Sequence, residues 1–192
     1  LEADETIKGD VSAFYMNAEA ETRIKLDKTN PNHQLKSNDI PAVTSEFSFE
    51  VSPAKASVSE KYKFTWAGID KIGEEMRFKP FLFYAQDMNP FLPTERYTPI
   101  FLGNPFSETI KVIFNIPSNY EIVSLPKSSS VVLDDLAKFK LVVSSDETSV
   151  QMMSELNFNE YYFEVADYAS VKKLMDEMIR KHADEIVIRK KK

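Results

Sequence analysis

Alternating apolar and polar residues predict β-strands along most of this chain. The organising stretch is 95–126, which contains two such alternating runs, Thr109–Ile116 and Tyr120–Leu125. A two-residue period is typical of a strand with one buried and one solvent-facing side. Pro117 and Pro126 end the two runs, because proline cannot donate a ladder hydrogen bond. The stretch therefore predicts a β-hairpin bounded by prolines.

Runs of the same kind lie on both sides of this hairpin. Further strands are expected at 6–16, 47–51, 58–66, 75–84, 131–133, 139–143, 150–158 and 186–188. Gly9-Asp10 suggests a break or bulge in the first of them. Pro80 suggests that 75–84 is an edge strand or a bent one. This density of strands indicates a fold that is mostly β.

Two segments read as helices instead. Residues 18–27 are rich in Ala, Glu, Arg and Lys and follow Asn17, a good N-cap residue. Near the other end, apolar residues recur at helical spacing and form one stripe: Val171, Leu174, Met175, Met178, Ile179 and His182. This second helix is amphipathic, so we expect its stripe to be buried against a sheet.

The predicted fold is mostly β (α+β): an antiparallel β-sandwich with a short N-terminal helix and one C-terminal amphipathic helix packed on a sheet. A chain of 192 residues is one large domain or two small ones. We expect residues 1–36 to be a strand and helix that link from a missing upstream domain. Residues 37–192 are then the β-sandwich domain with its C-terminal helix and strand.

The composition argues against several classes of partner and site. The formal net charge is −6, which argues against nucleic acid as a partner. The sequence has no cysteine, so it has no disulfide framework, thiolate zinc site or cysteine nucleophile. No stretch approaches the ~20 apolar residues that span a membrane. We expect no cofactor and no metal.

Candidate catalytic residues are few. The two histidines are His33, in a loop rich in Asn and Pro, and His182, near the end of the helix stripe. We interpret both as surface or helix-end residues rather than as bases or ligands. There is no G-x-S-x-G motif, and four glycines leave little room for phosphate-binding loops. The sequence therefore predicts that the chain is not an enzyme.

Aromatic residues offer the one plausible binding surface. Trp66, Tyr97 and Tyr161 are candidates for a sugar-stacking or ligand surface, with Tyr120 and Tyr162 as further pieces. Because Trp66 continues an apolar stripe, core packing is the default for it. A solvent-facing cluster of two or three aromatics on one sheet face would favour a carbohydrate-binding module, whereas a buried Trp66 would favour a structural one.

Arg96 is a candidate structural brace. It follows a Pro-rich turn and precedes the apolar run 99–102. A charge in such surroundings is costly unless its guanidinium is hydrogen-bonded. We expect it to bind backbone carbonyls or a carboxylate and to pin the 89–95 turn to the sheet. The alternative is that it reads an anionic ligand.

Several motifs together resemble a known bacterial domain. They are NPF at 89–91, ERYTPIFLGNPF at 95–106, IPSNYEIVSLP at 116–126, the Tyr-led helix at 168–182, EIVIRK at 185–190 and IKGDVSAFYMNAEAETR at 7–23. This order is similar to a domain of unknown function that follows the core of bacterial transglutaminase-like proteins. Those proteins carry another uncharacterised β-rich domain at their N-terminus.

The resemblance implies a role but no catalytic residues. The Cys–His–Asp site of the family belongs to its core domain, and without cysteine that core is absent from this chain. The resemblance implies a non-catalytic structural or interaction module of an exported, periplasmic or otherwise secreted, protein. Its partner would be the transglutaminase-like core of the same protein, or another protein or a glycan.

Overall fold

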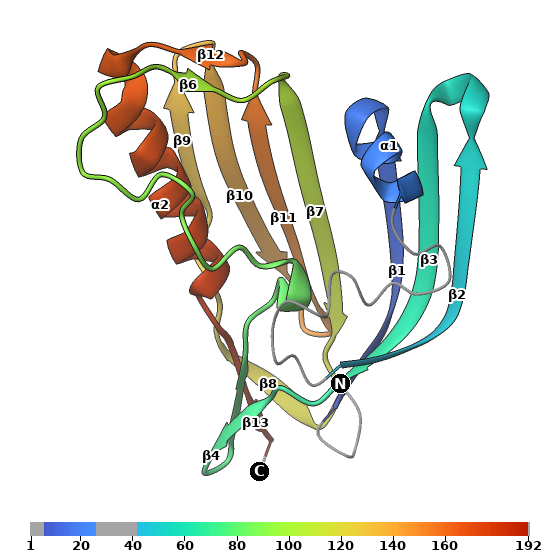
Figure 1. The fold of residues 1–192 in the computed structure, drawn as a ribbon. Coiled ribbons are helices and arrows are strands. Elements are labelled where there is room, and N and C mark those ends of the chain that lie inside the picture. Colours follow the sequence, from blue (N-terminus) through green and yellow to red (C-terminus); the bar gives the residue numbers. More distant parts are fainter. Residues whose placement is uncertain (1–5, 26–41, 192) are drawn as a thin grey trace. The chain divides into compact units, whose positions relative to one another are not determined.

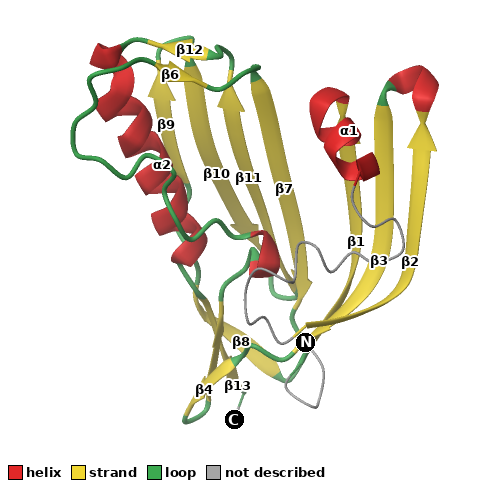
Figure 2. Ribbon diagram, in the orientation of Figure 1, coloured by secondary structure: helices red, strands yellow, loops and turns green. Residues whose placement is uncertain are grey.

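The computed structural model describes residues 6–25 and 42–191, and it contains two compact units that divide between Asp70 and Lys71. Figure 1 shows the elements in chain order, and Figure 2 separates helix from strand. The domain boundary expected between residues 36 and 37 lies outside the described residues.

Unit 1, residues 1–70, contains one antiparallel sheet. Its strands are β1 (Ile7–Met16), β2 (Ala42–Ser52) and β3 (Ser57–Trp66), in the order β1-β3-β2. A short helix, α1 (Asn17–Lys25), follows β1 and packs on β1 and β3, and the 3-10 turn Pro53–Lys55 joins β2 to β3. The alternation predicted for β3 is present, since Val58, Tyr62, Phe64 and Trp66 are all buried.

The bulge expected at Gly9-Asp10 is wrong. Strand β1 pairs with β3 without interruption, and Gly9 lies opposite Phe64. A Cβ at Gly9 would lie 2.7 Å from the Phe64 ring, so glycine is needed there to let the ring cover the strand. The register shift is in β2 instead, between Ser45 and Ser48, where Glu46 has φ of 55°.

A buried ion pair ties α1 to this sheet. Arg23 donates from Nη2 to Glu60 Oε1, and the two side chains are 3% and 1% exposed. The Arg23 guanidinium also lies over the Tyr15 ring, 4.9 Å from its centroid. Glu60 is on the otherwise apolar face of β3, so the carboxylate depends on the helix for its partner.

Unit 2, residues 71–192, is built on a four-stranded antiparallel sheet covered by a helix. The strands are β7 (Phe106–Asn115), β9 (Ser129–Leu133), β10 (Ala137–Ser145) and β11 (Ser149–Phe158), in the order β7-β11-β10-β9. Helix α2 (Tyr168–Ala183) packs on β9 and β10 (Figure 1). Its predicted stripe is buried, apart from the half-exposed Ile179. Leu174 and Met178 on α2, and Phe139 and Leu141 on β10, are all buried.

The same unit contains a second sheet and a short two-stranded ribbon. The second sheet is β4 (Asp70–Ile72), β5 (Glu75–Phe78), β13 (Ile186–Lys190) and β8 (Tyr120–Ser124), in that order. Phe78 of β5 packs on Phe114 of β7, with ring centroids 5.1 Å apart, which joins the two sheets. The ribbon pairs β6 (Ile100–Phe101) with β12 (Tyr162–Phe163), and 3-10 turns lie at Leu82–Tyr84 and Val165–Asp167.

These elements confirm the predicted fold class. The chain is mostly β, its sheets are antiparallel, its N-terminal helix is short, and its long C-terminal helix packs on a sheet.

The predicted hairpin is wrong in its pairing, although both strands exist. Strand β7 pairs with β11 over ten residues, and β8 pairs with β13 in the other sheet. Two-residue hairpin turns need residues with positive φ, and neither Ser118 nor Asn119 has one. Pro117 accepts a hydrogen bond from Tyr120 N instead, which redirects the chain between sheets. Both strands therefore pair with strands that are distant in the sequence, and not with each other.

The edge strand expected at 75–84 is also corrected. Strand β5 ends at Phe78, before Pro80, and the chain continues into the 3-10 turn. Within the second sheet β5 lies between β4 and β13, so it is not an edge. Pro80 is compatible with this because it falls outside the ladder.

Candidate functional site

The segment after the 3-10 turn, residues 85–99, is held along α2 by polar contacts. Asn89 Nδ2 donates to Asp176 Oδ1 at 2.7 Å and to Lys172 O at 3.1 Å. Lys172 Nζ donates to Phe91 O at 2.6 Å, and Tyr168 donates its hydroxyl proton to Pro93 O at 2.7 Å. The first NPF motif is therefore a turn whose Phe91 is buried. These contacts fix the chain just before β6.

The β6/β12 ribbon at the end of this segment exposes aromatic side chains. Phe101 is 70% exposed and Tyr161 46%, and their rings meet edge to face at 5.6 Å and 85°. Phe101 lies opposite Tyr162 in the ribbon, and Leu102 N donates to Tyr161 O at 2.8 Å. Tyr97, which precedes β6, is 85% exposed. We use the name β6/β12 surface for these four residues, Tyr97, Phe101, Tyr161 and Tyr162, together with the exposed carboxylates of Glu95, Asp134, Asp135, Glu160 and Glu164.

Carboxylates lie in the chain segments next to the aromatic residues. Exposed acids of the neighbouring segments are Glu95, Asp134, Asp135, Glu160 and Glu164. The β9–β10 turn joins the ribbon because Asn159 donates from Nδ2 to Asp135 O at 2.8 Å and from its backbone N to Leu136 O at 2.9 Å. Desolvation, and secondarily the Glu164 carboxylate, raise the pKa of Tyr162 above its ordinary value. The surface therefore combines exposed rings with negative charge.

The three aromatic residues proposed from the sequence do not share one environment. Tyr97 and Tyr161 belong to unit 2 and are exposed. Trp66 belongs to unit 1 and is only 9% exposed, with its ring over Gly68. The buried Trp66 is the feature expected of a structural module, while the exposed tyrosines are the feature expected of a binding one. Sequence reasoning did not single out Phe101, because a two-residue strand is too short to show a period.

Arg96 makes a local contact. It is half-buried, and its Nε donates to Thr98 O at 3.0 Å, two residues along the chain. This is a backbone carbonyl, as the bracing hypothesis expects. The contacts that hold the turn at 89–93, however, come from α2 through Asn89, Tyr168 and Lys172.

A serine–histidine pair lies in the core of unit 2. His182 Nε2 is 2.8 Å from Ser154 Oγ, and the side chains are buried at 1% and 3% exposure. Gln86 N donates to His182 Nδ1 at 3.2 Å, so Nδ1 is an acceptor and the proton is on Nε2. Burial lowers the pKa of His182 to about 4. The surface position expected for His182 is therefore wrong, although the residue does lie at the end of α2, and its place in the helix stripe was a signal for burial.

This pair is arranged unlike a catalytic dyad. A nucleophilic serine needs an unprotonated imidazole nitrogen to accept its proton. Here Nε2–H donates to Ser154, and the Phe81 ring packs on the imidazole with centroids 4.4 Å apart. The arrangement satisfies buried polar groups and holds α2 against the sheet. His33, the other histidine, lies outside the described residues.

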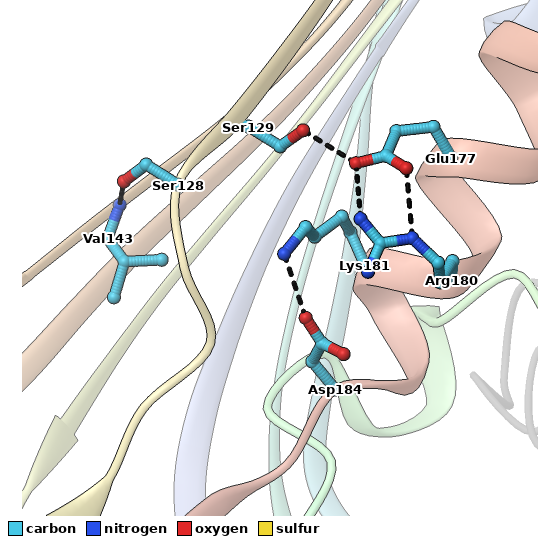
Figure 3. Close-up of polar contacts among 7 residues, drawn as sticks. All are labelled: Ser128, Ser129, Val143, Glu177, Arg180, Lys181 and Asp184. Carbon is cyan, nitrogen blue, oxygen red and sulfur yellow. Dashed lines mark hydrogen bonds and ion pairs between the residues drawn. The ribbon is translucent and has the colours of Figure 1, made fainter.

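Charged residues at the C-terminal end of α2 are paired with each other (Figure 3). Arg180 donates from Nε and Nη2 to Glu177, at 2.9 and 2.6 Å, and Glu177 also accepts from Ser129 Oγ at 2.6 Å. These contacts, led by the Arg180 hydrogen bond, lower the pKa of Glu177. Lys181 Nζ binds Asp184 Oδ2 at 3.0 Å. A hollow of about 320 Å³ adjoins this cluster and residues 125–127. Since Arg180 and Lys181 are already paired, the hollow is not a good anion site.

Within residues 6–25 and 42–191, no group of His, Asp and Glu is arranged to hold a metal ion. Among the same residues, no helix is both long and apolar enough to cross a membrane.

In a comparison with known proteins, part of the chain matches a family model. No curated protein and no solved structure matches the chain. A family model described as "Domain of Unknown Function with solved-structure structure (DUF3858)" matches residues 74–188, which is more than half of the 192 residues. The match contains the motifs at 95–106 and 116–126 and the helix at 168–182. The chain therefore belongs to the DUF3858 family of domains of unknown function.

Proposed function

We propose that this chain is a non-catalytic structural and interaction module of an exported bacterial transglutaminase-like protein. It packs on the core domain of that protein or binds another protein partner. The observation that carries the proposal is the β6/β12 surface, where aromatic side chains remain exposed on a unit whose core is otherwise filled.

The composition of this surface supports a protein partner. Phe101 and Tyr97 are 70% and 85% exposed, well beyond what a core requires. Tyrosine and phenylalanine are enriched at protein interfaces because they bury a large area at little cost in conformational entropy. Clustered exposed apolar residues, as opposed to scattered ones, mark interaction sites.

Two features support the non-catalytic part of the proposal. The sequence has no cysteine, so the thiol chemistry of a transglutaminase-like core has no nucleophile here. The serine–histidine pair holds its proton on the nitrogen that faces Ser154, and both side chains are buried. The link to a transglutaminase-like core, and with it the exported location, rests on the sequence resemblance.

The second candidate is a carbohydrate-binding module that uses Tyr97 and Tyr161. Their exposure favours it. Sugar stacking requires a ring face, however, and the Phe101 and Tyr161 rings are at 85° to one another, so the pair does not form a flat platform. The buried Trp66 removes the largest aromatic from such a site. We therefore favour the protein partner.

The test begins with the gene. The proposal expects an export signal and a transglutaminase-like core encoded upstream of Leu1. That core, expressed separately, should bind the 192-residue chain in isothermal titration calorimetry, while transglutaminase, protease and esterase assays of the chain alone stay at background. A gene without such a core, or an oligosaccharide that binds where the core does not, contradicts the proposal. Turnover that is abolished by Ser154→Ala contradicts its non-catalytic part.

A further inference from the structure

We propose that the β6/β12 surface recognises a positively charged polypeptide segment, one in which lysine or arginine residues alternate with apolar ones. The inference rests on the proposed function as an interaction module, and it adds the surface and the chemistry of the partner.

The aromatic half of the surface presents rings to solvent in a fixed arrangement. The backbone bond from Leu102 N to Tyr161 O and the ribbon pairing hold Phe101 beside Tyr161 and Tyr162. The buried Phe163 anchors β12, since its ring packs edge to face on Phe158 at 5.7 Å. An incoming side chain therefore meets preorganised rings, which reduces the entropy lost on binding.

The acidic half lacks cations to neutralise it. Among the described residues, none of Glu95, Asp134, Asp135, Glu160 and Glu164 forms an ion pair. Elsewhere in unit 2, by contrast, Glu121 is paired with Arg189 and Glu177 with Arg180. The one basic residue in the segments 92–104 and 159–167 is Arg96, whose Nε is directed to Thr98 O.

These two halves select the same ligand chemistry. Lysine and arginine side chains interact with the faces of exposed tyrosine and phenylalanine rings. Carboxylates that form no ion pair attract the same cations and increase the association rate. The hydrogen bond that Glu95 accepts from the Tyr97 hydroxyl at 2.9 Å leaves its negative charge in place. An acidic polypeptide or an anionic polymer would be repelled, and a neutral glycan could use the carboxylates as hydrogen-bond acceptors but gains no charge attraction from them. Charge complementarity therefore points to a cationic, partly apolar segment.

Fluorescence anisotropy on the 192-residue chain tests the inference. The probe is a short fluorescein-labelled peptide in which lysine alternates with leucine, compared with a peptide that has glutamate in place of lysine. We expect the lysine peptide to bind and the glutamate peptide not to bind. Because the contacts are exposed, affinity should fall steeply between about 0.05 and 0.5 M salt.

Matched variants localise the binding. Asp135→Asn with Glu160→Gln should weaken binding about threefold or more, and Phe101→Ala with Tyr161→Ala more than about fivefold, as expected at the centre of an interface. The charge control is Glu74→Gln with Glu147→Gln, which removes the same charge from other turns. The apolar control is Ile113→Ala, at a side chain 66% exposed on β7. Both controls should stay within about twofold of the parent, and far-ultraviolet circular dichroism confirms that each variant is folded.

Equal weakening by the charge control and the surface variant would overturn the inference, because binding would then reflect net charge alone. Equal binding of the glutamate peptide, or no binding of either peptide, would also overturn it. Titration with the transglutaminase-like core domain distinguishes failure of this inference from failure of the proposed function. If the core binds and the surface variants leave that affinity unchanged, this inference fails and the proposed function holds. If the core does not bind the parent chain, the proposed function fails.

Discussion

The burial of His182 predicts that unit 2 loses stability in mildly acidic solution. Burial lowers the pKa of this side chain from 6.5 to about 4. An unfolded chain binds the proton with an ordinary pKa, so between these two values the unfolded state holds more protons than the folded state. Stability is then fully present above pH 6.5 and falls as the pH drops toward 4.

The magnitude follows from the size of the shift. Each pKa unit corresponds to ~1.36 kcal/mol, so the full effect is about 3 kcal/mol, most of it lost between pH 6.5 and 4. This is a large fraction of the 5–15 kcal/mol typical of domains. Protonation would also turn Nδ1 into a second donor facing Gln86 N, in a site buried from water. This change disfavours the folded state, in agreement with the sign.

The assay compares urea unfolding of the parent and of His182→Gln at a series of pH values, followed by far-ultraviolet circular dichroism. The variant removes the titrating group while its amide can still bond to Ser154 and Gln86 N. The difference in pH dependence isolates His182, because the carboxylates and His33 are common to both proteins. Parallel stability profiles, or a His182 that titrates near 6.5 by NMR, would refute the reasoning.

Three further predictions concern stability. Leu174→Ala should cost about 2–5 kcal/mol because this side chain of α2 is fully buried. Lys173→Ala, at the exposed neighbouring residue, should change the free energy of unfolding by less than about 0.5 kcal/mol. Equal effects in urea unfolding would show that the helix is not docked through its stripe. Asn89→Ala removes two contacts to α2 and should destabilise by about 1–3 kcal/mol. Arg96→Lys should destabilise the fold by less than Asn89→Ala does, since the bond from Arg96 to Thr98 is local. A larger loss for Arg96→Lys than for Asn89→Ala in thermal unfolding would restore Arg96 as the main brace of the 89–95 turn. Glu60→Gln removes the carboxylate that pairs with the buried Arg23 and should cost about 3 kcal/mol or more. Unchanged unfolding of unit 1, read by Trp66 fluorescence, would contradict this.

The positions of strands and helices were predictable because they depend on local periodicity. Tyr62, Phe64 and Trp66 alternate with polar residues, and the stripe around Leu174 repeats at helical spacing; the structure buries both sets. Pairing was less predictable, because a partner strand can be distant in sequence. Strand β8 pairs with β13, near the other end of the chain, so the neighbouring β7 offered a misleading local choice.

The candidate site was only partly predictable for a related reason. Tyr97 and Tyr161 were identifiable as aromatic residues outside any apolar stripe. Their neighbours were not, because the ribbon of β6 and β12 brings together segments sixty residues apart through two residues of each. The buried Ser154–His182 contact likewise depends on how the end of α2 packs against the sheet, which no local pattern specifies.

The proposed docking through the β6/β12 surface can be measured by hydrogen–deuterium exchange of the 192-residue chain, alone and with the separately expressed transglutaminase-like core. We expect peptides covering 97–102 and 160–165 to become protected on binding, while the β10–β11 turn at 145–149 does not change. Protection confined to other segments, or none at saturating core, would contradict it.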